Sequence, residues 1–148
     1  MEQVIVQTVK TTDDVISKLK CSGIESGFYH NAPFCNDATK YLFFSTNDGQ
    51  YNCFAVVSYY EFGVKGRFNC KMIHPDIHYC LEWIQTNPTY IKRGLATCLL
   101  KAITSICKCF VAQCHKSNYP FFINRGGILL GKNFLDKEKV YFLFGSRH

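Results

Sequence analysis

The sequence of 148 residues contains no apolar run that approaches the roughly 20 residues needed to span a bilayer. Its first residues also lack the basic segment and the long apolar segment of a secretory signal peptide. No stretch carries about five or six charges of one sign, so a basic tail for nucleic acid is not indicated. These absences predict an intracellular, cytoplasmic protein without a membrane segment, and they argue against a nucleic-acid partner.

The residues that are present indicate one globular domain over 1–148. Hydrophobic residues make up 47% of the chain and aromatic residues 16%, which is enough for a substantial core. The formal net charge of +6 suits a polyanionic ligand, and it suits nucleic acid equally well. Charge alone therefore leaves the ligand class open.

Nine cysteines are an odd and high count, and most of them lie within apolar stretches. In a cytosolic protein such residues act as small hydrophobic side chains, so a disulfide framework is not expected. Cys107, Cys109, Cys114 and His115 are close together in sequence, but their spacing differs from the usual zinc pattern. We therefore expect no metal site.

Hydrophobic periodicity predicts an α/β fold in which an antiparallel meander leads into a strand, a helix and a further strand. A helix capped by Thr11 follows the first strand. The aromatic loop over 24–39 forms either a packed lid or a substrate wall, with packing favoured. Strands are expected at 2–9, 40–46, 51–62, 67–73, 77–86, 110–114 and 140–144. The apolar face of the long helix consists of Leu95, Leu99, Ala102, Ile103, Ile106 and Phe110.

The strongest functional signal lies between Leu81 and Leu100. Residues 81–86 can lie extended, Pro88 prevents a continuing ladder, and a helix begins at Gly94. A helix start attracts phosphate through its unpaired N–H groups and its dipole. The side chains around this start fit such a ligand, because some are small, two are cationic and one is a hydroxyl: Lys92, Arg93, Gly94, Ala96 and Thr97.

The segment Ile84-Gln-Thr-Asn-Pro-Thr-Tyr90 and the following Ile91-Lys-Arg-Gly94-Leu-Ala96 resemble the acetyl-coenzyme A-binding motif of the GNAT superfamily of N-acetyltransferases. That motif joins a strand ending in Pro-x-Tyr to Arg/Gln-x-x-Gly-x-Gly/Ala and a helix. Pro88, Tyr90, Gly94 and Ala96 match in register. Two positions depart from the motif, because Ile91 replaces Arg or Gln and Thr86 replaces an aliphatic residue.

The resemblance implies a GNAT-like, mostly antiparallel sheet with flanking helices, and acetyl-coenzyme A as cosubstrate. It also implies an amine acceptor, either a small molecule or a peptide. A main-chain N–H of residues 84–86 would polarise the thioester, and Arg93 would compensate for Ile91. The implied cofactor contacts are Ile84, Gln85, Thr86, Ile91, Lys92, Arg93, Gly94, Leu95, Ala96 and Thr97.

Acetyl transfer needs a base, because a lysine-type amine has a pKa of about 10.4. Glu82 is the first candidate, since strand alternation places it on the same face as Ile84 and Thr86. A structural ion pair is the competing interpretation of Glu82, and His78 is a second candidate base. Tyr119 is the candidate acid, with Tyr90 and Tyr141 as other phenols.

A second, weaker resemblance covers the C-terminal helix. Phe122 occupies the tyrosine position of the family, Gly127 the following aromatic position and His115 the asparagine position. With Ile91, these departures favour an alternative, a catalytically impaired GNAT-fold module that acts through protein interaction. A small basic nucleic-acid-binding domain is the other alternative. The acceptor stays open, as does the oligomeric state, for which a homodimer paired through aromatic strands is one option.

Overall fold

The computed structural model describes residues 3–31, 38–47, 50–68, 70–90 and 94–145. The strands in this part of the chain are β1 (Gln3–Val9), β2 (Thr39–Asn47), β3 (Gln50–Tyr59), β4 (Tyr79–Thr86), β5 (Cys109–His115), β6 (Ile128–Lys132) and β7 (Lys139–Gly145). They form one sheet in the order β1-β2-β3-β4-β5-β7-β6. Among these strands only β4 and β5 pair in parallel, so the expected mixed, mostly antiparallel sheet is confirmed.

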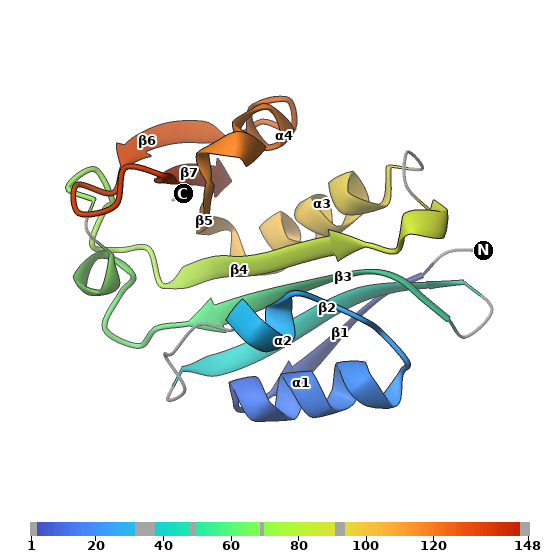
Figure 1. The fold of residues 1–148 in the computed structure, drawn as a ribbon. Coiled ribbons are helices and arrows are strands. Elements are labelled where there is room, and N and C mark those ends of the chain that lie inside the picture. The colour runs from blue at the N-terminus through green and yellow to red at the C-terminus, as the bar shows by residue number, and fades with distance from the viewer. Residues whose placement is uncertain (1–2, 32–37, 48–49, 69, 91–93, 146–148) are drawn as a thin grey trace.

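Helices cover both faces of the sheet (Figure 1). Two lie on one face, α1 (Thr12–Cys21) and α2 (Phe28–Asn31), and α3 (Leu95–Cys107) lies on the other. The short α4 (Tyr119–Ile123) follows β5 and packs on the α3 side. The predicted cap of α1 is confirmed, because Thr11 Oγ1 accepts a hydrogen bond of 3.1 Å from the backbone N–H of Asp14.

The long helix is shorter than its sequence pattern predicted. It ends at Cys107, and Phe110 lies in β5, where it is fully buried. Ile106 is 51% exposed, so its predicted place on the apolar face is wrong. Leu99 and Ile103 do face the core, where they pack against the sheet. The helical spacing of the apolar residues therefore predicted the helix and its buried face correctly but placed the end of the helix too late.

The segment between β3 and β4 folds across the sheet, on the face that carries α1 and α2. Val64, Ile73 and Ile77 are buried there against β4, β5 and β7 residues. The prediction of a strand over 67–73 is wrong, since the chain forms a 3-10 turn at Lys65–Arg67 instead. The physical reason is that these apolar side chains cover an existing sheet face, which does not require strand pairing.

Three local features complete the comparison with the sequence. The predicted hairpin is confirmed by the pairing of Asn47 with Gln50. The short α2 was not predicted, although Phe28 packs in the core as expected. Strand β6 was also missed, because it is an outer strand whose Ile128 and Leu129 are exposed. Within the described residues, no helix has the length and apolar character needed to cross a membrane.

Candidate functional site

Strands β4 and β5 separate soon after they begin to pair. Their parallel pairing consists of Cys80 with Val111 and Leu81 with Ala112. Beyond this point β4 stays paired to β3 as far as Thr86, while β5 stays paired to β7 along its whole length. Figure 1 shows the two strands diverging. The sheet therefore opens along the part of β4 that carries the sequence motif.

Helix α3 begins at the open end of this parted sheet. Its N-cap Gly94 is left-handed, with φ 72°, and no described side chain caps the helix. The backbone N–H of Cys98 is the first to be paired within the helix, to Gly94 O at 3.0 Å, which leaves the preceding N–H groups as donors. No described heavy atom lies within 4 Å of the position that a Cβ on Gly94 would occupy. This end of α3 can therefore be approached by an anion.

The motif residues around this helix start have different surroundings. Leu95 and Ala96 are buried in the core, so only their backbone is free to contact a ligand. Tyr90 packs against the same core, at the end of the 3-10 turn η2 (Pro88–Tyr90). Ile91, Lys92 and Arg93, which the motif assigned to the cofactor, lie outside the described residues.

Arg125 is a cation at this site that the sequence analysis missed. Its Nε donates a hydrogen bond of 3.2 Å to Thr97 Oγ1 in the first turn of α3. Its Nη1 donates to Phe121 O at 3.0 Å, and the guanidinium lies 3.9 Å from the centre of the Phe121 ring. Because Thr97 Oγ1 accepts this bond, its own hydrogen remains a donor. The signal was not visible in sequence, since 28 residues separate the two partners.

Glu82 does not share a face with Ile84 and Thr86, which corrects the expectation from strand alternation. Val56 of β3 pairs with Trp83, and Val57 pairs with Leu81, so Glu82 is the extra residue of a β-bulge. Glu82 stays on the face of Cys80, the one that carries α1 and α2, and the bulge reverses the alternation of the residues that follow it. Ile84, by contrast, packs against the core beneath α3.

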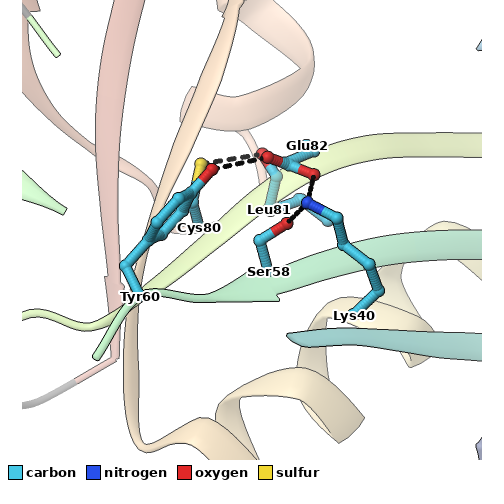
Figure 2. Close-up of polar contacts among 6 residues, drawn as sticks. All are labelled: Lys40, Ser58, Tyr60, Cys80, Leu81 and Glu82. Carbon is cyan, nitrogen blue, oxygen red and sulfur yellow. Dashed lines mark hydrogen bonds and ion pairs between the residues drawn. The ribbon is translucent and has the colours of Figure 1, made fainter. Parts of the chain in front are cut away.

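The carboxylate of Glu82 is held by two donors (Figure 2). The hydroxyl of Tyr60 donates to Oε1 at 2.8 Å, and Lys40 Nζ donates to Oε2 at 3.2 Å. Lys40 Nζ also donates to Ser58 Oγ at 2.6 Å. The side chain of Glu82 is 4% exposed, and Glu82 directly follows Leu81, the last residue of β4 that pairs with β5. The competing interpretation of Glu82 as part of an ion pair is thus confirmed, and its position at the parting of the sheet keeps it a candidate base.

Solved structures share this architecture. The N-acetyltransferase YlbP of Bacillus subtilis, solved with coenzyme A, matches with a TM-score of 0.59 at 15% identity, and 97% of each chain is covered. The PaiA N-acetyltransferase of Thermoplasma acidophilum, also with coenzyme A, matches at 0.57 and 11% identity, over 97% of this chain and 99% of that one. A GNAT-family acetyltransferase of Streptococcus agalactiae matches at 0.56 and 17% identity, over 97% and 96%. The chain has the GNAT fold.

A scan of protein-family models and a search of curated proteins found no match. The likeness is therefore one of architecture at low identity, and the GNAT fold expected from the motif is confirmed. In this GNAT fold, β4 and α3 carry the motif, and β5, α4 and β7 form the opposite flank of the opening. The individual roles of the residues are proposals that follow from the geometry.

The candidate acid Tyr119 lies on that opposite flank. It begins α4, is 39% exposed and meets the Phe142 ring edge-on at 5.4 Å between centroids. Phe122, at the tyrosine position of the family, is 5% exposed and stacks on Phe142. Tyr141 is fully buried and accepts a hydrogen bond from Asn133, and burial raises its pKa. Tyr119 is therefore the better placed phenol of the two.

His78 lies at the wrong end of β4 for the chemistry. It precedes the strand, on the side where β4 and β5 are still paired, and its Nδ1 lies 2.9 Å from Tyr60 O.

Two thiols of the sheet, those of Cys53 and Cys114, are also unsuited to catalysis. Burial raises the pKa of Cys53 to about 11 and that of Cys114 to about 12. Both stay protonated near pH 7 and neither offers a thiolate nucleophile.

A cavity of about 640 Å³ lies on the β3 side of β4, away from the opening. The α1–α2 loop, the start of β3 and the end of β4 line it, and Glu25 is its carboxylate. Gln85 fixes this loop, because its Nε2 donates to Glu25 O at 2.9 Å and its Oε1 accepts from Ser26 at 2.6 Å. Asn52, in the wall, is fully buried, and neither of its side-chain polar atoms has a hydrogen-bond partner among the described residues. The side chain of Gln85, which the resemblance implied as a cofactor contact, is therefore hydrogen-bonded to the α1–α2 loop instead.

Proposed function

We propose that this protein transfers an acetyl group from acetyl-coenzyme A to a primary amine. The observation that carries the proposal is the separation of β4 from β5 directly before the uncapped start of α3. The place proposed for the extended thioester arm is between the parted strands, where main-chain N–H groups of residues 84–86 on alternate positions point away from β3. The diphosphate at the other end of the arm meets the N–H groups of α3.

The chemistry then needs one proton acceptor and one proton donor. The acceptor ammonium gives a proton to Glu82, directly or through water, and the free amine attacks the thioester carbon. A main-chain N–H of β4 stabilises the oxyanion of the tetrahedral intermediate. The carbon–sulfur bond breaks, and the sulfur leaves with its electron pair and takes a proton from Tyr119. The new amide nitrogen loses its second proton, which passes through water to the Tyr119 phenolate.

The acceptor would approach from the face that carries α1 and α2, because the Glu82 side chain points to that face. The cavity on the β3 side of β4 carries Glu25 among mostly neutral polar residues. Such a lining suits a neutral or cationic molecule better than an anion, since the described residues that line it include no lysine or arginine.

Acetyl-coenzyme A is expected to raise the thermal midpoint of the protein. A ligand that binds only the folded state, at about 100 times its Kd, stabilises it by about 2.7 kcal/mol, or about 5–10 °C for a chain of this size. Differential scanning fluorimetry measures the shift, and release of the coenzyme A thiol with an amine measures turnover. An unchanged midpoint at millimolar acetyl-coenzyme A would contradict the proposal.

Replacement of Arg125 tests the cation that lies beside α3. Arg125→Ala is expected to raise the KM for acetyl-coenzyme A by about tenfold or more, because a hydrogen bond to a charged group contributes about 1.5–3 kcal/mol. Arg125→Lys keeps the charge and should recover part of the loss. Steady-state kinetics at fixed amine measure both. A KM that is equal in all three proteins would remove Arg125 from the cofactor site.

A second candidate function, protein interaction through a GNAT-fold module, is favoured by one surface. Large apolar side chains are exposed around β6 and the loop that follows it: Ile128 at 60%, Phe134 at 59% and Leu135 at 76%. Such side chains are typical of an interaction surface when they gather in one place. If acetyl-coenzyme A leaves the thermal midpoint unchanged, we would assign the protein to this second function.

A further inference from the structure

Lys40 and Glu82 form a buried ion pair that links β2 to β4. Lys40 Nζ lies 3.2 Å from Glu82 Oε2, and the two side chains are 0% and 4% exposed. Removing two charges from water costs as much as their attraction returns, and apolar replacements of such pairs are often neutral or stabilising. Folding alone therefore gives a weak reason for two charges at this position.

The geometry of the pair restricts the carboxylate closely. Tyr60 donates to one oxygen of Glu82 and Lys40 to the other, so rotation of the carboxylate is opposed from both sides (Figure 2). Lys40 is itself anchored by Ser58, which lies on β3 between the two strands. Three neighbouring strands thus position one functional group, as precise catalytic geometry requires.

The place at which the carboxylate is held is the parting of the sheet. Glu82 follows Leu81, which makes the last pair with β5. The side chain of Glu82 lies on the α1 and α2 face, as Cys80 does, and the bulge places Ile84 on the α3 face. A thioester lying between the strands would therefore have Glu82 beside its reacting end, with the amine approaching over the Glu82 side chain.

An unbalanced carboxylate at this point would have an unwanted effect. It would bind the acceptor as its ammonium ion, which is the unreactive form, and hold that form in a salt bridge. Lys40 cancels the charge of Glu82, so the site has no net charge with which to retain an ammonium. When Glu82 takes up the amine proton, Ser58 remains as a partner for Lys40.

We propose that Lys40 is a positioning residue for acetyl transfer, which fixes Glu82 and balances its charge so that the acceptor is not trapped as an ammonium ion. The inference rests on the proposed function. The amine proton passes to the Glu82 carboxylate, the nitrogen bonds to the thioester carbon, and the carbon–sulfur bond breaks with its electron pair on sulfur. Lys40 touches neither substrate and acts through Glu82.

The test compares Lys40→Met with Lys40→Arg in the full chain. The probes are acetyl-coenzyme A and whichever of a lysine peptide, a polyamine and an aminoglycoside the wild type acetylates fastest. Lys40→Met is expected to lower kcat and also to lower the KM for the amine, each by about tenfold, because the carboxylate now retains the ammonium. Lys40→Arg keeps the charge and should recover most of both changes. Lys101→Met, on the exposed side of α3, is the control for loss of a lysine.

A merely structural role predicts a different pattern. In that case Lys40→Met lowers the thermal midpoint but leaves kcat and KM of the folded protein unchanged, and this result would overturn the proposal. If Lys40→Met does not fold, Lys40→Gln carries the test, because it also removes the charge but keeps a polar side chain beside Ser58. Unchanged kcat and KM in Lys40→Gln would then reject the proposal, and a fall in both constants would support it.

The proposed function and the role of Lys40 can fail separately. A wild-type protein that releases no thiol with any of the three amines ends the proposed function, and the role of Lys40 ends with it. A wild type that acetylates an amine while Lys40→Met retains both kinetic constants ends only the role of Lys40.

Discussion

Gly94→Glu is expected to abolish coenzyme A binding. The substitution places a carboxylate at the start of α3, where no described atom occupies the space that a Cβ would take. Two like charges about 4 Å apart repel by about 4 kcal/mol at an effective dielectric constant near 20, which is roughly a thousandfold in affinity. The shift of the thermal midpoint with coenzyme A, seen in the wild type, should then disappear.

The matched control is Gly94→Gln. Both side chains impose the same left-handed strain, because Gly94 has φ 72°, at a cost of about 1–2 kcal/mol in folding stability. They have nearly the same size, so they differ only in charge. Gly94→Gln should lower the midpoint as much as Gly94→Glu but retain most of the coenzyme A shift. Equal loss of the shift in both variants would mean that bulk or strain, and not phosphate repulsion, explains the result.

The start of α3 was predictable because its determinants are local. A glycine at a left-handed position and the apolar repeat that follows it lie within a short stretch of sequence, and both are found where expected. The mostly antiparallel sheet with flanking helices was implied by the same stretch through the resemblance. What the sequence does not show is the contact of Arg125 with Thr97, because it depends on how α4 packs against α3.

The side on which Glu82 lies was not predictable, because a bulge depends on pairing. Alternation along β4 assumes one residue opposite one residue, and the mismatch with Val56 and Val57 of β3 breaks that rule. The burial of Lys40 is a second non-local result. Lys40 lies on the same face of β2 as Ala38 and Leu42, which are both buried. That face is covered by α1, by α2 and by the segment between β3 and β4.

Packing also explains the departures from the family pattern at the C-terminal helix. A Cβ at Gly127 would lie 2.8 Å from Phe144 Cζ and 2.9 Å from Phe122 O, so the aromatic side chain of the family pattern does not fit there. Phe122 in turn packs against Phe142 and Phe144. Phe122 therefore contributes to the core at the position where the family has a phenol. The candidate phenolic acid of this chain is Tyr119, one helical turn earlier.

Glu82→Gln is expected to lower kcat by about 100-fold near neutral pH, the lower range for loss of a general base. Coenzyme A binding should persist, because Glu82 lies on the opposite face of β4 from Ile84 and the core beneath α3. The deficit should shrink as the pH rises toward the amine pKa of about 10.4, since the acceptor then loses its proton in solution. This profile is measured as the rate of thiol release from about pH 6 to about pH 10, a range that stays below the amine pKa.

The control for Glu82→Gln has to separate the loss of the base from the loss of the ion pair, because the glutamine removes the negative charge that Glu82 presents to Lys40. The double variant Lys40→Met with Glu82→Gln has no buried charge, so it should regain thermal stability while kcat stays low. Glu61→Gln removes an exposed carboxylate close to Tyr60 and should leave the profile unchanged. If the double variant regained turnover together with stability, Glu82 would be a structural partner of Lys40, and the proton would have to leave by another route.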